Sequence, residues 1–417
     1  MIVAKFGGSS VRNGEAMLFS SSVIENQSEI GFSIISATYQ TTNQLEQLVK
    51  LAIASPSFDQ VLLELNTLHL KHKNIAEELY SSREVYSFIN AEFEQLQASL
   101  QIIFEERKCS PAMMDRVYAV GELVASFIFF DLLKLRLPDR EVEFLDAREL
   151  MITNADFNKA QPLLEEIKAR VDLKIVKGCP QKLYVTQGFI GKTPEGETTT
   201  LGREGSDYSA ALFGEALDAS EIQIWTDVEG VFNFDPRVVT NASVIRKLNY
   251  KQATLLAENG AKVLFERTLD PALRKNIPVF VGNSKKPHAG GTIISSLTLR
   301  EYDSTKKPPM VLGMAALKNE YQWIVTFVFS QDAKTINIQE RKNQFAAKFI
   351  QHPKMLVHKC QIYFSDETVF KVINEKEVID SRNVEHAWNQ LPEQFLIDCF
   401  QVMEELNASS LFLSESN

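Results

Sequence analysis

The sequence lacks the features that mark disulfide scaffolds, zinc sites and membrane proteins. Its 417 residues include four cysteines, which lie far apart and without the paired spacing of disulfides or metal ligands. The most apolar stretch, residues 124–133, contains Asp131 and is well short of the ~20 residues that span a bilayer. The apolar run at the start of the sequence is too short for a signal peptide. We therefore expect a cytoplasmic protein that does not contact a membrane.

Positive charge is also scarce. The chain has 44 Lys and Arg against 54 Asp and Glu, a formal net charge of -10 at pH 7. A broad nucleic-acid-binding surface needs a basic field to displace phosphate counterions, so this balance argues against nucleic acid as a partner. It leaves room for a small, locally basic site that binds an anionic ligand.

What the sequence does contain is an alternation of short apolar runs with helical patterns. Such an alternation predicts βαβ units and a mostly parallel, buried sheet, which is the α/β class. The predicted strands are residues 2–6, 32–37, 183–186, 222–226 and 279–281.

Three amphipathic or apolar segments predict helices. One is marked by apolar residues at three- and four-residue steps, and a second spans residues 112–135. A third spans residues 207–217, with Ser206 as its expected N-cap. The stepped residues are Val85, Ile89, Phe93, Leu96, Leu100 and Ile103.

The pattern breaks near residue 300, where a polar segment ends in two prolines. We expect one domain over residues 1–300, a linker over 301–309 and a smaller α+β domain over 310–417. In the last, the predicted elements are strands at 323–329, 355–357, 361–364 and 369–373 and a helix near 393–406.

The strongest local signal is a glycine-rich turn after the first strand, where Lys5 precedes Gly7-Gly8-Ser9-Ser10. Glycines let backbone N–H groups approach an anion, a following helix N-terminus adds partial positive charge, and lysine supplies a full charge. The spacing differs from a Walker A loop and from a dinucleotide fingerprint. The motif indicates a phosphate site, and an ordinary strand-to-helix turn with a solvated lysine is the alternative.

A second signal is Gly202-Arg203-Glu204-Gly205-Ser206-Asp207. An arginine on such a turn can hold a carboxylate or phosphate through two parallel hydrogen bonds. Asp207 taken alone fits a helix cap better than a catalytic role.

Two further positions are weaker signals. Thr226-Asp227 follows a predicted strand, at the end where open α/β sheets bind ligands, although such a pair is usually a turn. Glu122 lies inside an apolar helical pattern, so it needs a partner or a substrate cation if it is buried. A partly exposed glutamate is the alternative.

Taken together and in this order, these segments resemble the aspartate kinase family, within the amino-acid-kinase fold. The resemblance covers residues 2–295 and rests on the ordered set rather than on any single motif. The set includes Lys5-Phe6-Gly7-Gly8-Ser9-Ser10, Ser36-Ala37, Thr42-Asn43, Gly121-Glu122, Gln187-Gly188-Phe189, the segment from Thr200 to Asp207, Trp225-Thr226-Asp227, Asp235-Pro236-Arg237 and Gly260-Ala261-Lys262.

The resemblance implies a three-layer α/β/α fold and transfer of the ATP γ-phosphoryl group to the β-carboxylate of L-aspartate. The products would be 4-phospho-L-aspartate and ADP, the first step of lysine, threonine and methionine biosynthesis. The nucleophilic carboxylate is already ionised at neutral pH and needs no general base. Catalysis should therefore rest on positioning and cationic stabilisation, with Mg²⁺ shielding the nucleotide phosphates.

The resemblance also assigns roles by position, and it assigns no protein ligand for a metal. Lys5 would bridge the transferring phosphoryl group, and Asp207 would orient it. On the substrate side, Arg203 would hold the α-carboxylate and Glu122 the ammonium, with Thr42 and Ser206 beside them. The expected ATP-binding residues are Lys5, Gly7, Gly8, Ser36, Thr226, Asp227, Phe232, Arg237 and Lys262.

The chain departs from the family pattern at three places. Tyr39-Gln40-Thr41 stands where the family has a small glycine before Thr-Asn, and Phe232 stands where it has a tyrosine. Phe265-Glu266 replaces His-Pro. The principal charged groups are kept, so we expect activity to be retained.

The C-terminal region, residues 310–417, is expected to be an ACT-like regulatory and dimerisation domain. Aspartate kinases carry two ACT domains, and this segment fits one unit with a fragment, or a diverged pair. We expect a homodimer with weak or absent inhibition by lysine or threonine.

Two other functions stay open at this point. One is a different amino-acid or carboxylate kinase of the same fold. The other is a catalytically inactive paralogue that binds nucleotide or amino acid and regulates. The joint presence of Lys5, Glu122, Arg203 and Asp207 argues against an inactive protein.

Overall fold

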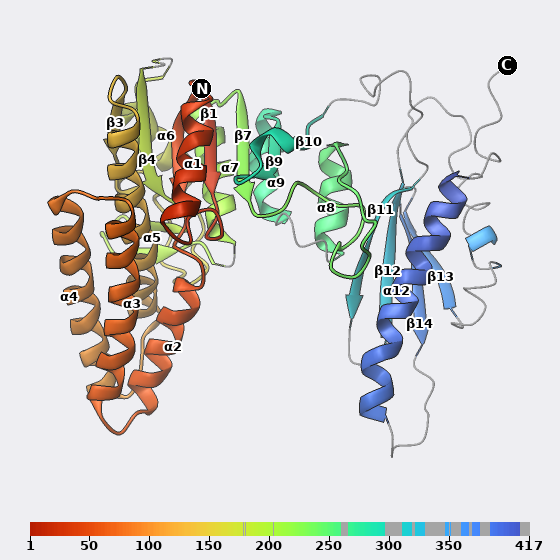
Figure 1. Ribbon diagram of the computed structural model, residues 1–417, viewed down its shortest axis with the longest axis horizontal. Coiled ribbons are helices and arrows are strands. Elements are labelled where there is room, and N and C mark those ends of the chain that lie inside the picture. The colour runs from red at the N-terminus through yellow and green to blue at the C-terminus, as the bar shows by residue number, and fades with distance from the viewer. Residues whose placement is uncertain are drawn as a thin grey trace. The chain divides into compact units, whose positions relative to one another are not determined.

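A mostly parallel β-sheet organises the computed structural model of the protein (Figure 1). Its strands are β1 (Ile2–Phe6), β2 (Ile30–Ile35), β3 (Glu141–Phe144), β4 (Lys182–Gln187), β7 (Glu221–Thr226), β8 (Lys247–Leu248), β9 (Val279–Asn283) and β10 (Gly291–Ile294). They lie in the order β3-β4-β2-β1-β7-β9-β10-β8. β1 pairs in parallel with both β2 and β7, and β4 does so with both β2 and β3. The expected α/β class is confirmed.

The chain forms two units, which are described separately. The first contains Met1–Glu229 and Arg267–Gly291, and the second contains Gly230–Glu266 and Thr292–Asn417. The expected linker at residues 301–309 lies outside the described residues, so the boundary at residue 300 stays a prediction. The structure describes residues 1–177, 179, 181–202, 204–259, 266–296, 311–318, 322–329, 347–349, 351, 360–366, 369–375 and 384–408.

All five strands predicted in the first 300 residues are present, with ends shifted by at most two residues, because each is an apolar run with nearly all its residues buried. The strands that were not predicted are short or polar. They include β3, which alternates Glu with apolar residues, and the antiparallel pair β5 (Ile190–Lys192) and β6 (Thr198–Thr200).

The helices are α1 (Gly14–Glu25), α2 (Thr41–Ala54), α3 (Phe58–Glu78), α4 (Arg83–Glu106), α5 (Pro111–Arg136), α6 (Leu164–Lys174), α7 (Gly205–Leu217), α8 (Tyr250–Glu258), α9 (Glu266–Lys275) and α12 (Val384–Ala408). Two short 3-10 helices are η1 (Ala147–Glu149) and η2 (Pro287–Ala289). All six stepped apolar residues of the first predicted helix are buried in α4, and the predicted helix 112–135 is α5. No helix in the described part of the chain is long and apolar enough to cross a bilayer.

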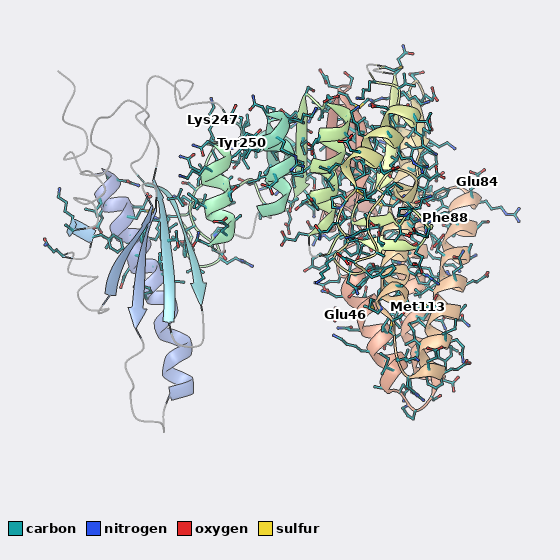
Figure 2. The ribbon with its side chains drawn as sticks, turned by 180° about the vertical axis from the view of Figure 1, so that it is seen from behind. Glu46, Glu84, Phe88, Met113, Lys247 and Tyr250 are labelled. Carbon is teal, nitrogen blue, oxygen red and sulfur yellow. The ribbon has the colours of Figure 1, made fainter. Side chains whose placement is uncertain are left out.

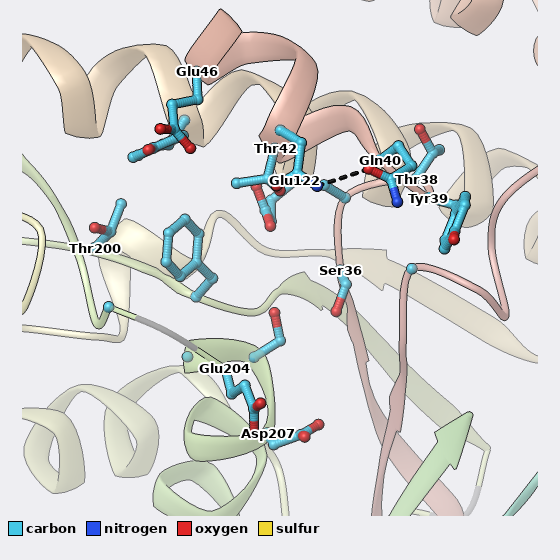
Figure 3. Close-up of a pocket in the computed structure, with 18 of the residues that line it drawn as sticks. Ser36, Thr38, Tyr39, Gln40, Thr42, Glu46, Glu122, Thr200, Glu204 and Asp207 are labelled. Atoms are coloured by element: carbon cyan, nitrogen blue, oxygen red, sulfur yellow. Dashed lines mark hydrogen bonds between the residues drawn. The ribbon is translucent and has the colours of Figure 1, made fainter. Parts of the chain in front are cut away.

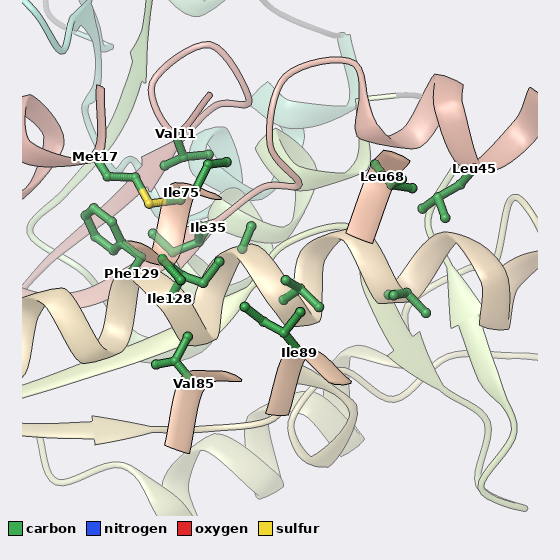
Figure 4. Close-up of a cluster of buried hydrophobic side chains, with 14 of the residues drawn as sticks. Val11, Met17, Ile35, Leu45, Leu68, Ile75, Val85, Ile89, Ile128 and Phe129 are labelled. Carbon is green, nitrogen blue, oxygen red and sulfur yellow. The ribbon is translucent and has the colours of Figure 1, made fainter. Parts of the chain in front are cut away.

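The core of the first unit lies between helices α1 to α5 and one face of the sheet (Figure 4). Among the helices themselves, the ring of Phe88 on α4 stacks on the ring of Phe127 on α5 at a centroid distance of 4.1 Å. Figure 2 marks the position of Phe88. Leu45, Leu68 and Ile89 bring α2, α3 and α4 into the same buried cluster.

Helices cover both faces of the sheet in the first unit, which makes the expected three layers. On one face, Phe6 contacts Phe129 of α5 at a centroid distance of 5.7 Å. On the other, Phe32 contacts Phe213 of α7 at 5.2 Å. Because side chains alternate along a strand, Lys5 points to the opposite face from Phe6 and therefore toward α7.

The predicted capping of α7 by Ser206 is wrong. The helix begins at Gly205, and the residue at its N-cap position is Glu204, whose φ of 58° is left-handed. Gly202 also has a positive φ, of 83°. This tight turn starts the helix two residues before the predicted start, so Ser206 already lies in its first turn.

The second unit contains a four-stranded antiparallel sheet and a long helix. The strands are β11 (Val311–Lys318), β12 (Gln322–Phe329), β13 (Cys360–Asp366) and β14 (Val369–Glu375), in the order β11-β12-β14-β13. Phe327, Phe349 and Phe400 of this unit lie in one buried cluster with α12. Three predicted strands and the predicted helix are present, β11 was not predicted, and the strand at 355–357 lies outside the described residues. The ACT-like character of this region stays a prediction.

Candidate active site

A cavity of about 1010 Å³ opens in the first unit at the carboxyl ends of β1, β2 and β7 (Figure 3). Loops after all three strands contribute to it, together with α2, α5 and α7. This is the position where parallel sheets bind ligands. Eight of the predicted site residues line it, namely Lys5, Gly8, Ser36, Thr42, Glu122, Ser206, Asp207 and Asp227.

The other predicted residues are placed differently. Gly7 and Thr226 adjoin lining residues in the sequence. Phe232 and Arg237 belong to the second unit, where the exposed Arg237 pairs with Asp235 at 2.6 Å. Predicted residues outside the described part of the chain are Arg203 and Lys262.

An ion pair joins the two predicted catalytic residues. The Nζ atom of Lys5 lies 2.5 Å from Oδ1 of Asp207, and the two side chains are only 10% and 13% exposed. Lys5 is held on β1 in register with Ile34 of β2 and Ile224 of β7, while Asp207 lies in the first turn of α7. Desolvated charges persist when they are paired. Asp207 therefore serves this pair and is not the cap residue of α7.

The two glycines in the turn after β1 let neighbouring groups lie close to the backbone of the turn. A Cβ atom on Gly8 would lie 2.9 Å from the carbonyl oxygen of Ala37, and one on Gly7 would lie 3.3 Å from Nζ of Lys5. The N–H group of Gly7 donates to Trp225 O at 3.0 Å, so Gly7 contributes space beside Lys5. The helix expected just after Ser10 begins only at Gly14, because Asn13 caps it by accepting from Ala16 N–H.

Glu122 is a buried carboxylate at the cavity. Its residue is 3% exposed, and burial raises its pKa to about 8, although a hydrogen bond from the Ala37 backbone acts in the opposite direction. No described group makes a hydrogen bond with its Oε2 atom. Helix α2 packs closely against this position, because a Cβ on the adjacent Gly121 would lie 3.0 Å from Thr41 Cγ2. A buried, incompletely paired carboxylate can bind a ligand cation.

A turn and the first turn of α2 form the opposite side of the cavity from Asp207, and we call residues 38–44 the cavity turn (Figure 3). Gln40 has a left-handed φ of 65° and occupies the N-cap position of α2 without capping it by its side chain. That side chain instead accepts a hydrogen bond from Asn43 Nδ2 at 2.7 Å. This is where the sequence departs from the family pattern, which has a small glycine here. The structure shows that the departure places a residue with a Cβ atom in a left-handed conformation that favours glycine.

Replacing Gln40 by glycine is expected to give a more stable protein than replacing it by alanine. Both variants lose the hydrogen bond to Asn43, and only alanine keeps a Cβ atom in the left-handed region, which costs about 1 kcal/mol. The difference is measurable as a higher thermal unfolding midpoint for Gln40→Gly. At an ordinary helix position the order is the reverse, so an alanine variant that is equally stable would show that Gln40 is not strained.

Asp115 on α5 is a supporting residue that the sequence did not reveal. It is fully buried and accepts hydrogen bonds from Asn158 N–H at 2.9 Å and from the Thr200 N–H and hydroxyl groups at 2.9 and 2.6 Å. Asn158 and Thr200 line the cavity. The one signal available was an acidic residue within an apolar helical pattern.

Replacing Asp115 by asparagine is expected to lower the free energy of unfolding by about 2 kcal/mol. An amide keeps the shape but presents one acceptor oxygen and two donors to three donor groups. Chemical denaturation measures the change, and Thr200→Val, which removes only one of the three donors, should cost less. An asparagine variant as stable as the original protein would contradict this account.

Metal ligands are not grouped in the described residues. No set of three or more His, Cys, Asp or Glu side chains there could hold a metal ion. Single carboxylates such as Asp227 are exposed at the cavity.

The sequence is similar to those of known kinases. Residues 1–283 match the amino acid kinase family. Lysine-sensitive aspartokinase 3 of Escherichia coli (strain K12) is 35% identical over 322 residues, which cover 77% of this chain and 68% of that protein. Bifunctional aspartokinase/homoserine dehydrogenase 2 of Arabidopsis thaliana is 34% identical, and the match spans 34% of its length.

Solved structures of an aspartokinase are also similar to this chain. The structure of E. coli aspartokinase III in complex with aspartate and ADP superposes with a TM-score of 0.69 and 29% identity, over 95% of this chain and 84% of that chain. Its complex with lysine and aspartate gives a TM-score of 0.68 and 30% identity, over 92% and 82%.

Proposed function

The chain belongs to the amino acid kinase family, and we propose that it is an aspartate kinase, which transfers the γ-phosphoryl group of ATP to the β-carboxylate of L-aspartate. The 35% identity to the E. coli aspartokinase supports this. The observation that carries it is one cavity lined by both the buried Lys5–Asp207 ion pair and the buried, incompletely paired Glu122. A cation for a phosphoryl group and a carboxylate for an ammonium group are the two charges that this reaction requires.

In the proposed reaction, a β-carboxylate oxygen of aspartate attacks the γ-phosphorus of ATP. A new O–P bond forms, the bond between the γ-phosphorus and the β,γ-bridging oxygen breaks, and ADP leaves with that electron pair. The obstacle is the approach of two anions, because the carboxylate is ionised at neutral pH. Lys5 offsets the negative charge of the transferring group, and Asp207 holds Lys5 in position.

The amino-acid side of the cavity would be formed by Thr42, Glu122 and Ser206. Glu122 binds the substrate ammonium, which supplies the cation that its buried carboxylate lacks. Arg203, outside the described residues, is proposed for the α-carboxylate. Together these contacts would fix the β-carboxylate in line with the phosphorus, which is the positioning that phosphoryl transfer depends on.

The nucleotide side would be formed by Ser36, Thr226, Asp227 and the glycine turn. The carboxylate oxygens of Asp227 are the hard donors that Mg²⁺ prefers, and nucleotide phosphates can supply the remaining ligands. When bound, Mg²⁺ neutralises phosphate charge.

A hydroxylamine trap tests the proposal, because acyl phosphates convert to hydroxamates. The purified full-length chain with ATP and aspartate is expected to form hydroxamate and release ADP, whereas glutamate should give little of either. Product with glutamate alone would indicate a different carboxylate kinase, and no product with any acid would indicate an inactive paralogue. Adding lysine or threonine to the same assay tests the expected weak or absent inhibition.

A further inference from the structure

Lys71 on α3 does not line the cavity, yet the hydrogen bonds that its ammonium group makes with described residues all go to the cavity turn. Its Nζ atom donates to Tyr39 O at 2.8 Å, to Thr41 Oγ1 at 3.0 Å and to Gln44 Oε1 at 3.0 Å. An ammonium group has three N–H donors, so this one segment uses all of them.

The position of this ammonium group is electrostatically unfavourable. It is partly buried, and burial lowers the pKa of Lys71 to about 8. No carboxylate in the described residues forms an ion pair with it. It also lies at the first turn of α2, which begins at Thr41, and the helix dipole disfavours a cation there. An apolar side chain would avoid these costs, so the contribution of Lys71 lies in its three hydrogen bonds.

The next residue, His72, holds the other end of the same turn. Thr41 Oγ1 lies 2.6 Å from Thr38 Oγ1, which lies 3.2 Å from Nε2 of His72. Nδ1 of His72 lies 2.9 Å from Leu68 O. Burial lowers the pKa of His72 to about 4, so the ring is neutral and Nδ1 must donate to that carbonyl.

The direction of every hydrogen bond in this network then follows. Nε2 of His72 accepts from Thr38, so the Thr38 hydroxyl accepts from Thr41, and the Thr41 hydroxyl accepts from Lys71. We call this series of hydrogen bonds, from Lys71 through Thr41, Thr38 and His72 to Leu68, the Lys71–Leu68 relay. It fixes both sides of Gln40, the left-handed residue of the cavity turn.

We infer that Lys71 is a positioning residue, which holds the cavity turn in the conformation that presents Thr42 to the amino-acid substrate and so sets the affinity for that substrate. Thr38, Tyr39, Gln40 and Thr42 all line the cavity, whereas Lys71 does not. The substrate named here rests on the proposed function, and the geometric role of Lys71 does not.

Steady-state kinetics of Lys71→Met test this role. We expect the KM for aspartate to rise about tenfold, with kcat and the KM for ATP changed by less than about twofold, because charged hydrogen bonds are lost only on the amino-acid side. Lys73→Met is the matched control, since it removes the same charge from the same helix two residues away, and it should leave all three parameters unchanged. An unchanged KM for aspartate in folded Lys71→Met, or equal losses in all three parameters, overturns the inference.

A second variant and a second measurement keep the test decisive. If Lys71→Met does not fold, Thr41→Val breaks the relay at its middle with little change of volume and should raise the same KM. If the original protein does not use aspartate, the proposed function fails, and hydrogen exchange of the free protein still decides the role of Lys71. Faster exchange of the amides of residues 38–44 in Lys71→Met supports the role, and unchanged exchange there refutes it.

Discussion

Lys5→Ala is expected to lower kcat by about a thousandfold, because it removes the cation that offsets charge on the transferring phosphoryl group. The structure supplies the reason for an effect of this size. Lys5 is nearly buried, is fixed by neighbouring strands on both sides and faces Asp207 at 2.5 Å. ADP release at saturating aspartate and ATP measures the loss.

Two companion variants make this result interpretable. Lys182→Ala removes a lysine from the same sheet at the amino end of β4, where it pairs with Glu141 and Glu143, and should leave kcat unchanged. The double variant Lys5→Met, Asp207→Asn avoids leaving a buried carboxylate unpaired, and it should fold normally while remaining as inactive as Lys5→Ala. Substantial turnover by either Lys5 variant would refute the assigned role.

Glu122→Gln is expected to raise the KM for aspartate by about a hundredfold while leaving the KM for ATP unchanged. The amide keeps the shape of the side chain but loses the charge that binds the substrate ammonium. Glu92→Gln is the matched control, because burial also raises the pKa of Glu92 and this residue does not line the cavity. A KM for aspartate within a few fold of the original value would contradict the role of Glu122.

The pH dependence of this site follows from the same residue. Burial raises the pKa of Glu122 to about 8, so the carboxyl group becomes protonated as the pH falls below that value. Only the ionised form attracts an ammonium group, so kcat/KM for aspartate should fall about tenfold per pH unit below 8. Glu122→Gln should abolish this slope, and a slope that survives in the variant would have to come from another group.

The pH dependence of stability due to Glu122 should run in the opposite direction to the pH dependence of activity. The folded pKa lies above the ordinary value of 4.5, so between pH 4.5 and 8 the folded state binds more protons than the unfolded state. The contribution of Glu122 to stability is therefore present at low pH and decreases as the pH rises to 8. Glu122→Gln should lack this decrease.

The sequence predicted the parts of the fold that depend on continuous apolar pattern. The five buried strands and helices α4 and α5 follow from burial of one face or both, which the spacing of apolar residues records directly. Strands such as β3 and β6 were not predicted, because β3 mixes charged with apolar residues and β6 consists of polar residues. The predicted cap by Ser206 failed because a left-handed residue at Glu204 starts the helix earlier than its polar residues suggested.

The site was predictable to a different extent. Charged residues such as Lys5, Glu122 and Asp207 were singled out from their local patterns, the resemblance assigned their roles, and the structure brings these three to one cavity. Asp115 and Lys71 were missed, because each acts through hydrogen bonds to segments far away in the sequence. For Asp115 the sequence offered only an acidic residue within an apolar helical pattern, and neither residue's distant partners can be read from its local pattern.

The protons of the Lys71–Leu68 relay can be arranged in only one way. A network of hydroxyl groups can usually be satisfied with its hydrogens pointing either way, and it then alternates between two arrangements. Here one end is an ammonium group, which only donates, and the other is a carbonyl, which only accepts. The relay therefore has a single arrangement of its protons, so the direction of each of its hydrogen bonds is set without a ligand.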